Sequence, residues 1–128
     1  MTIELGAGAT ARRWDDMPEE QVGDGIARRL VGGSQGTALQ ILLAGGATLA
    51  AHAHPHEQFT HVISGSLRFT IGDGDDAREH TLDAGSIVHV PGGVRHEAYA
   101  LADTVAIDFF APARDDPVGG DRIIAAGR

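Results

Sequence analysis

A chain of 128 residues is long enough to bury the hydrophobic core of one domain. The sequence has no Cys and all ten of its basic residues are Arg, which excludes thiolate nucleophiles, disulfides and lysine Schiff bases. A net charge of −8 at pH 7 argues against nucleic acid as a partner, because the phosphates would be repelled.

The chain contains no apolar stretch of about 20 residues, and its N-terminal segment lacks the apolar centre of a signal peptide. We therefore expect a cytoplasmic protein with no membrane partner. No linker or repeat divides the sequence, so a single domain over residues 1–128 is expected. Within it we expect an N-terminal arm over residues 1–25 and a functional core over roughly residues 37–116.

Turn-forming clusters of Gly, Pro, Asp and Ser recur along the chain, and short β-branched and apolar runs lie between them. This pattern is typical of an antiparallel β-sandwich or a small β-barrel. The one candidate helix is short and covers residues 16–22, with Pro18 near its start. Strands are expected over residues 27–31, 37–43, 48–52, 58–63, 66–71, 77–82, 87–90, 96–100 and 104–110.

Two segments carry residues that can bind a metal. His52 and His54 are two residues apart, so on an extended chain their side chains point to the same side. Gln58 follows four residues later, and His96 ends the run GSIVHVPGGVRH. These four side chains could surround one divalent ion through nitrogen and oxygen atoms.

The spacing of both segments resembles the two motifs of the cupin family. The first segment matches at Gly46, His52, His54, Gln58 and Gly65, with Gln in place of the family's Glu, and the second at Gly85, Pro91, Gly93 and His96, with Ala100 where the family often has Asn. The resemblance implies an all-β jelly-roll barrel that holds one divalent transition metal, Ni, Zn, Mn or Fe.

Gln58 would make the metal shell uncharged. Three neutral imidazoles and an amide leave the full charge of +2 on the ion, whereas a Glu would lower it to +1. We therefore expect a strong Lewis acid that favours small anionic, chelating ligands. The set of two His and one carboxylate that typifies oxygen-activating iron is absent from these motifs.

The remaining His residues are expected to lie outside the metal shell. His56 falls in a turn, so a place at the pocket rim is favoured over a role as ligand. His61 should face away from Gln58 on the same strand, as a packed or interface residue. His80 and His89 are expected at the surface.

Near the C-terminus, an apolar strand carries an acidic residue. Val105, Ile107 and Phe109 should share one face of this strand, and Asp108 and Phe110 the other. A carboxylate on an apolar strand is costly unless it is paired or functional. One interpretation is an edge residue paired with Arg114.

A second interpretation comes from resemblance. The tail Asp108-X-Phe110-X-Pro112-X-Arg114-X-Asp116 and the run HPHEQ are similar to segments of the pectin-degradation cupins, which convert a 4,5-unsaturated uronate monosaccharide to its linear ketonised form. The resemblance implies catalytic roles for Asp108 and Arg114 and substrate binding by Phe110, and we assign Thr60 to the same substrate-binding set.

Three functions therefore stay open. The first is a metal-dependent isomerase or lyase for a small anionic, uronate-like or keto-acid-like substrate. The second is a cupin dioxygenase or polyketide-tailoring enzyme, and the third is a non-catalytic cupin that binds a small molecule. A homodimer is expected, formed through the N-terminal arm with Trp14 or through the face that carries Val105, Ile107 and Phe109.

Overall fold

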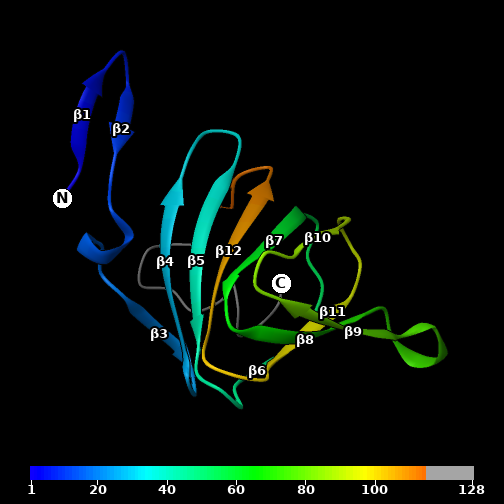
Figure 1. Ribbon diagram of the computed structural model, residues 1–128. Helices are drawn as coiled ribbons and strands as arrows, with labels where there is room; N and C mark the ends of the chain where they lie inside the picture. The colour runs from blue at the N-terminus through cyan, green and yellow to red at the C-terminus, as the bar shows by residue number, and fades with distance from the viewer. Residues whose placement is uncertain (115–128) are drawn as a thin grey trace.

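The structure is a computed structural model that describes residues 1–114, and these residues contain no α-helix (Figure 1). Two short 3₁₀ turns, η1 (Trp14–Asp16) and η2 (Gly74–Asp76), are the helical elements of this part of the chain. The prediction of an all-β fold is confirmed. The strands are β1 (Ile3–Gly6), β2 (Ala9–Ala11), β3 (Glu20–Gly23), β4 (Ile26–Gly32), β5 (Thr37–Leu43), β6 (Thr48–His52), β7 (Glu57–Ser64), β8 (Ser66–Ile71), β9 (Arg78–Asp83), β10 (Ile87–Val90), β11 (His96–Ala100) and β12 (Thr104–Ala111).

Two antiparallel sheets form the body of the molecule. A six-stranded sheet has the order β10-β7-β12-β5-β4-β3, and a four-stranded sheet has the order β6-β11-β8-β9. Successive strands such as β6 and β7, or β11 and β12, belong to different sheets, so the chain passes repeatedly between the two layers (Figure 1). Each sheet thus receives its strands from distant parts of the sequence.

The core lies between the sheets. Alternating residues of β5, namely Leu39, Ile41 and Leu43, are at most 2% exposed and point inward from the larger sheet. Leu67 and Phe69 of β8 meet them from the smaller sheet within the same cluster of buried side chains. On these strands the inward-pointing apolar side chains therefore recur at every second residue, the same period from which the strands were predicted.

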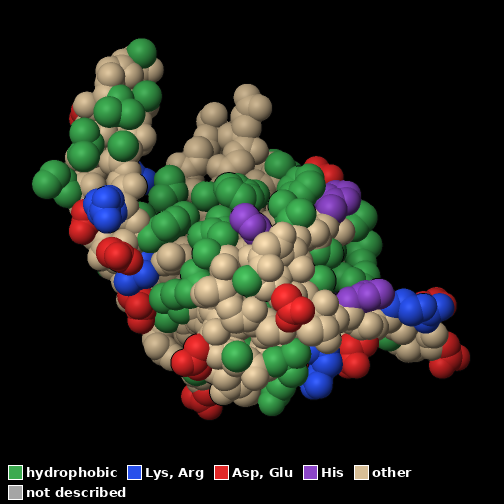
Figure 2. All heavy atoms as spheres, in the orientation of Figure 1, with side chains coloured by type: hydrophobic (Ala, Val, Ile, Leu, Met, Phe, Trp, Pro, Cys, Tyr) green, Lys and Arg blue, Asp and Glu red, His purple; other side chains and the backbone are tan. Residues whose placement is uncertain are grey.

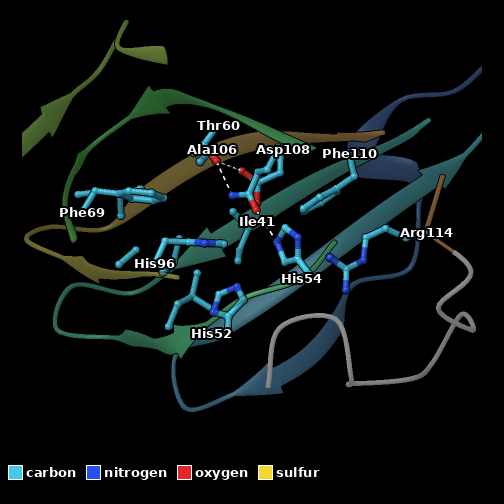
Figure 3. A pocket seen from close by; sticks show the side chains of 15 residues that line it. Ile41, His52, His54, Thr60, Phe69, His96, Ala106, Asp108, Phe110 and Arg114 are labelled. Atoms are coloured by element: carbon cyan, nitrogen blue, oxygen red, sulfur yellow. Dashed lines mark hydrogen bonds between the residues drawn. The ribbon is translucent and has the colours of Figure 1, made fainter. Parts of the chain in front are cut away.

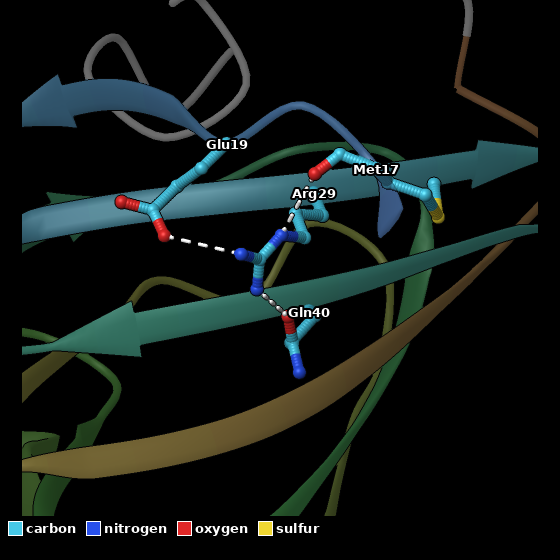
Figure 4. Close-up of polar contacts among 4 residues, drawn as sticks. All are labelled: Met17, Glu19, Arg29 and Gln40. Carbon is cyan, nitrogen blue, oxygen red and sulfur yellow. Dashed lines mark hydrogen bonds and ion pairs between the residues drawn. The ribbon is translucent and has the colours of Figure 1, made fainter. Parts of the chain in front are cut away.

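All nine predicted strands are present, with bounds that differ by one residue at most. The predicted helix over residues 16–22 is wrong. Asp16 is the last residue of η1, Met17 is extended, and the chain continues into β3, which pairs with β4 at the edge of the larger sheet. Arg29 of β4 holds it there: Nε donates to the Met17 carbonyl at 3.1 Å, and Nη2 meets Glu19 at 3.3 Å (Figure 4).

The turn between β7 and β8 requires glycine. Gly65 has φ +86°, which is the left-handed region, and a Cβ atom at this position would lie 2.3 Å from the carbonyl oxygen of Asp103. The turn therefore packs directly against the connection that leads into β12. Gly65 is also the last glycine of the first motif.

Several of the exposed apolar side chains in residues 1–114 gather in two regions. The hairpin of β1 and β2 forms its own two-stranded sheet and stands away from the barrel, with Ile3 and Leu5 more than half exposed (Figures 1 and 2). The second region lies on the outer face of β7, β10 and β12. We call it the outer apolar patch, and it comprises Phe59, Ile63, Ile87 and Phe109.

Within residues 1–114, no helix has the length and apolar character needed to cross a membrane.

Candidate metal centre

Strand register brings the two motifs together. In the smaller sheet, His96 of β11 lies opposite His52 of β6. In the larger sheet, Gln58 and Thr60 of β7 lie opposite Phe110 and Asp108 of β12, respectively. The inward-facing side chains of both sheets line one cavity, and His54 reaches it from the connection between β6 and β7 (Figure 3). All the predicted site residues among the described part of the chain therefore meet there.

The three predicted His ligands form a compact cluster. One ligand atom from each of His52, His54 and His96 lies within 4.8 Å of the other two. The ring centroids of His52 and His96 are 4.3 Å apart, and that of His54 lies 5.7 Å and 5.1 Å from them. Such separations suit three imidazoles that converge on one ion.

Backbone carbonyls orient each ring. Nδ1 of His52 lies 2.7 Å from the oxygen of Ala50, and Nδ1 of His96 lies 2.9 Å from that of Val94. Nδ1 of His54 lies 3.1 Å from the oxygen of His56. A carbonyl only accepts, so these bonds favour a proton on Nδ1 and leave the Nε2 lone pairs for a metal.

His96 gives the clearest sign that the cluster suits a metal. Its ring is 3% exposed, and Nε2 has no hydrogen-bond partner among the described residues. An unpartnered nitrogen at such depth is costly unless something binds it. A divalent transition metal held by nitrogen fits this position and the two neighbouring rings.

Electrostatics keep the cluster uncharged. Burial lowers the pKa of His52 and that of His54, and the positive charge of Arg114 lowers both further. Burial lowers the pKa of His96 to about 4. All three imidazoles are thus neutral near pH 7, the form that binds metal.

The turn in the second motif packs against the loop of the first motif. The backbone N–H of Gly93 donates to the carbonyl of His54 at 2.8 Å. A Cβ atom on Gly92 would lie 2.3 Å from the carbonyl oxygen of Pro55, so this close approach needs glycine. The turn over residues 91–93 therefore fixes the loop that presents His54.

A chain of hydrogen bonds connects Gln58, which lies beside the cluster, to the buried carboxyl group. Nε2 of His54 and Oε1 of Gln58 lie 2.9 Å apart, and because His54 carries its proton on Nδ1, both atoms are acceptors that can face one ion. Nε2 of Gln58 donates to Oγ1 of Thr60 at 2.8 Å. Oγ1 of Thr60 donates to Oδ1 of Asp108 at 2.6 Å. Burial raises the pKa of Asp108 to about 6, although the Thr60 bond and the charge of Arg114 oppose the rise.

Asp108 does not occupy an edge strand, as one interpretation of the sequence supposed. Its strand β12 lies between β7 and β5, where Asp108 is opposite Thr60 of β7 and Leu39 of β5. The predicted alternation is confirmed, since Asp108 and Phe110 are buried while Ile107 and Phe109 are partly or largely exposed.

Arg114 and Phe110 form another wall of the cavity. The guanidinium carbon of Arg114 lies 4.8 Å from the centroid of the Phe110 ring, in cation–π geometry. The backbone N–H of Arg114 donates to Oγ1 of Thr37 at 2.8 Å, which fastens the segment after β12 to β5. Asp116, the last residue of the predicted tail motif, lies outside the described residues.

The cavity itself is small, with a volume of about 20 Å³. That is room for about one ion or water molecule. A sugar-sized ligand would extend beyond it on the side of His52, which is the most exposed of the three His residues.

The other His residues lie outside the cluster. The ring of His56 is 5.7 Å from that of His54 and 6.5 Å from Phe110, beside the site, while His61 lies on the opposite face of β7 from Gln58. His80 and His89 are exposed, and Nε2 of His89 lies 2.6 Å from Glu57.

Sequence reasoning missed the groups that orient the site. The carbonyls of Ala50, Val94 and His56 were not foreseen, nor was the bond between Gln58 and Thr60. The Gln58–Thr60 bond did have a signal in the sequence, because the two residues are two apart and so share one face of a strand. Carbonyl directions leave no such signal in the sequence.

Comparison with known proteins agrees with this geometry. The cupin domain family matches residues 38–110, and the chain belongs to the cupin family. It resembles in particular the pectin degradation protein KdgF of Dickeya dadantii (strain 3937), with 30% identity over 105 residues that cover 80% of this chain and 92% of the relative.

Solved structures show the same fold. The structure of KdgF from Halomonas sp. has a TM-score of 0.73 and 26% identity, and covers 79% of this chain and 91% of its own. An RmlC-like cupin from Shewanella frigidimarina NCIMB 400 has a TM-score of 0.75 and 28% identity, over 89% and 96% of the two chains. The predicted cupin barrel and the resemblance to the pectin-degradation cupins are thereby confirmed.

Proposed function

We propose that the chain is a metal-dependent isomerase that opens and ketonises a small unsaturated uronate. One observation carries the proposal: Asp108, a buried carboxyl group, lines the same cavity as three convergent imidazoles and the guanidinium of Arg114. The likeness to proteins named for pectin degradation supports a uronate as the substrate class.

The metal would be held by His52, His54 and His96, with Oε1 of Gln58 completing the shell. When bound, a divalent ion supplies Lewis-acid polarisation of the substrate oxygens. No change in oxidation state is required, so a redox-inert ion such as Zn²⁺ is sufficient.

Each of the remaining side chains has a role set by its chemistry. Arg114 can bind the uronate carboxylate with two parallel hydrogen bonds. Phe110 packs against the sugar ring and excludes water. Asp108 takes the proton of the anomeric hydroxyl as the ring C–O bond breaks, which leaves an aldehyde and an enolate.

Returning that proton to C4 converts the enolate into the ketone. Atoms and electrons balance without an oxidant, because the reaction is an isomerisation. The raised pKa of Asp108, about 6, suits a group that both accepts and returns a proton near neutral pH.

The experiment is an NMR assay with the 4,5-unsaturated galacturonate monosaccharide under nitrogen, using protein reconstituted with Zn²⁺, Ni²⁺ or Mn²⁺. We expect the linear ketonised product in the absence of oxygen. Asp108→Asn should lower turnover by roughly 10²–10⁴-fold while metal content, measured by elemental analysis, stays unchanged.

Three other outcomes would contradict the proposal. Wild-type turnover in Asp108→Asn removes this residue from the mechanism. Oxygen uptake that depends on a redox-active metal favours a dioxygenase, and tight metal binding without turnover of the uronate favours a protein that only binds small molecules.

A further inference from the structure

The hydrogen bonds between Gln58 and Asp108 have a fixed direction. The chain of contacts runs from His54 through the Gln58 amide and the Thr60 hydroxyl to the Asp108 carboxyl group (Figure 3). Gln58, Thr60 and Asp108 are each at most 5% exposed. Water is therefore a poor substitute for any of these partners.

The Thr60 hydroxyl has one proton to give. An ionised carboxylate only accepts hydrogen bonds, so this proton goes to Oδ1 of Asp108, at 2.6 Å. The lone pairs of Oγ1 then face the Gln58 amide, 2.8 Å away, and only its NH₂ group can donate to them. The amide oxygen of Gln58 is thereby turned toward His54 and the centre of the cluster.

We propose that Thr60 is a positioning residue that sets the orientation of the Gln58 amide, so that its oxygen faces the metal. This inference rests on the metal site of the proposed function. The hydroxyl of Thr60 is hydrogen-bonded to Gln58 and Asp108, and not to the three imidazoles of the described cluster. Thr60 acts through Gln58, and the hydrogen bond to Asp108 orients the Thr60 hydroxyl.

The sequence explains why the Gln58 amide needs a partner that orients it. A Glu at position 58 would present an oxygen to the metal whichever way its carboxylate turned. Gln58 has one oxygen and one NH₂ group of nearly equal size, and the NH₂ group cannot ligate a cation. An orienting partner is therefore required by the replacement of Glu with Gln in the first motif.

Thr60→Val tests the proposal, because valine keeps the shape of the side chain and removes the hydroxyl. Affinity for Zn²⁺ is measured by competition with a chromophoric chelator. Loss of a group that orients a ligand typically weakens metal binding by 10–100-fold, and we expect a decrease in that range. Thr60→Ser keeps the hydroxyl and should bind Zn²⁺ nearly as tightly as the wild type.

A double-mutant cycle with Gln58→Ala separates positioning from a general structural role. If Thr60 acts through Gln58, then Thr60→Val has no further effect on Zn²⁺ affinity once Gln58 is Ala. The visible spectrum of the Co²⁺-loaded protein gives a second readout. The spectrum of Thr60→Val should resemble that of Gln58→Ala, since both lose the amide oxygen as a ligand.

Two results would overturn the inference: wild-type Zn²⁺ affinity in Thr60→Val, or an equal loss of affinity in the Gln58→Ala background. Circular dichroism of the metal-free variants checks folding, and Thr60→Ala replaces the valine variant if that one does not fold. If the wild type binds no Zn²⁺, the proposed metal site itself fails, an outcome that is distinct from a wild type that binds normally beside an unaffected variant.

Discussion

Asp108 shows what a buried carboxyl group costs the fold. Its carboxyl group is 5% exposed on a strand whose neighbours are mostly apolar, and burial raises its pKa from 3.8 to about 6. The folded protein therefore holds this proton more tightly than the unfolded chain does. Stability falls as pH rises from about 4 to about 6, and the deficit then stays constant at about 3 kcal/mol.

Asp108→Asn should remove this deficit, because an amide has no charge to desolvate. In metal-free protein at pH 8, we expect the variant to be more stable than the wild type by up to about 3 kcal/mol, with little difference at pH 4. Urea unfolding in the presence of EDTA at the two pH values measures the effect. Asp75→Asn, an exposed site, is the matched control, and equal pH profiles for Asp108→Asn and the wild type would contradict the prediction.

Among the structural elements, the turn after β7 has the most specific requirement for one residue type, which is glycine. Gly65 has a positive φ, and a Cβ atom there would overlap the connection into β12, the strand that carries Asp108. Gly65→Ala should destabilise the protein by about 3 kcal/mol, at the upper end of common single-residue effects.

Gly32→Ala is the control for that variant. Gly32 ends β4, and an added Cβ atom would meet nothing within 4 Å. Thermal or urea unfolding of the two variants should separate them clearly. A Gly65→Ala protein as stable as Gly32→Ala would show that the turn can rearrange at little cost.

The strands of the barrel could be predicted from the sequence because local pattern and burial agree there. Residues 37–43 alternate between two environments and are bounded by glycines, so their interpretation did not depend on any partner. Residues 20–23 lack such a pattern. They become a strand only because β4 lies beside them and Arg29 holds the preceding segment, which are contacts that no local rule describes.

The candidate site also has a part that could be predicted from the sequence and a part that could not. Spacing alone identified His52, His54 and His96, since two motifs fix ligand positions along the chain. The direction of a hydrogen bond is set by three-dimensional neighbours. The role of Thr60 between Gln58 and Asp108 was therefore outside the reach of spacing.

For the whole molecule, the outer apolar patch bears on assembly. Phe59 and Phe109 lie opposite each other on β7 and β12 and are 39% and 47% exposed. Aromatic pairs of this kind are frequent in interfaces between subunits. The homodimer expected from the sequence stays a prediction, and this patch is the surface that we expect to form it.

Replacing Phe59 and Phe109 with Ser should shift a dimer to a monomer in gel filtration at micromolar concentration. Leu101→Ser is a suitable control, because Leu101 is similarly exposed at 45% and lies in the connection between β11 and β12. A wild-type protein that elutes as a monomer would contradict the prediction, as would a double variant that remains dimeric.

The strand register that sets His96 opposite His52 also determines the stage of folding at which the side chains of the site can meet. Each of these residues is supplied by a strand far from the other in sequence, and Gln58 comes from the opposite sheet. The ligands meet only after the long-range pairings of both sheets have closed, which are the slow steps of a β topology. Capture of the proposed metal would then be a late event in biogenesis, and an occupied centre would report a barrel that has finished folding.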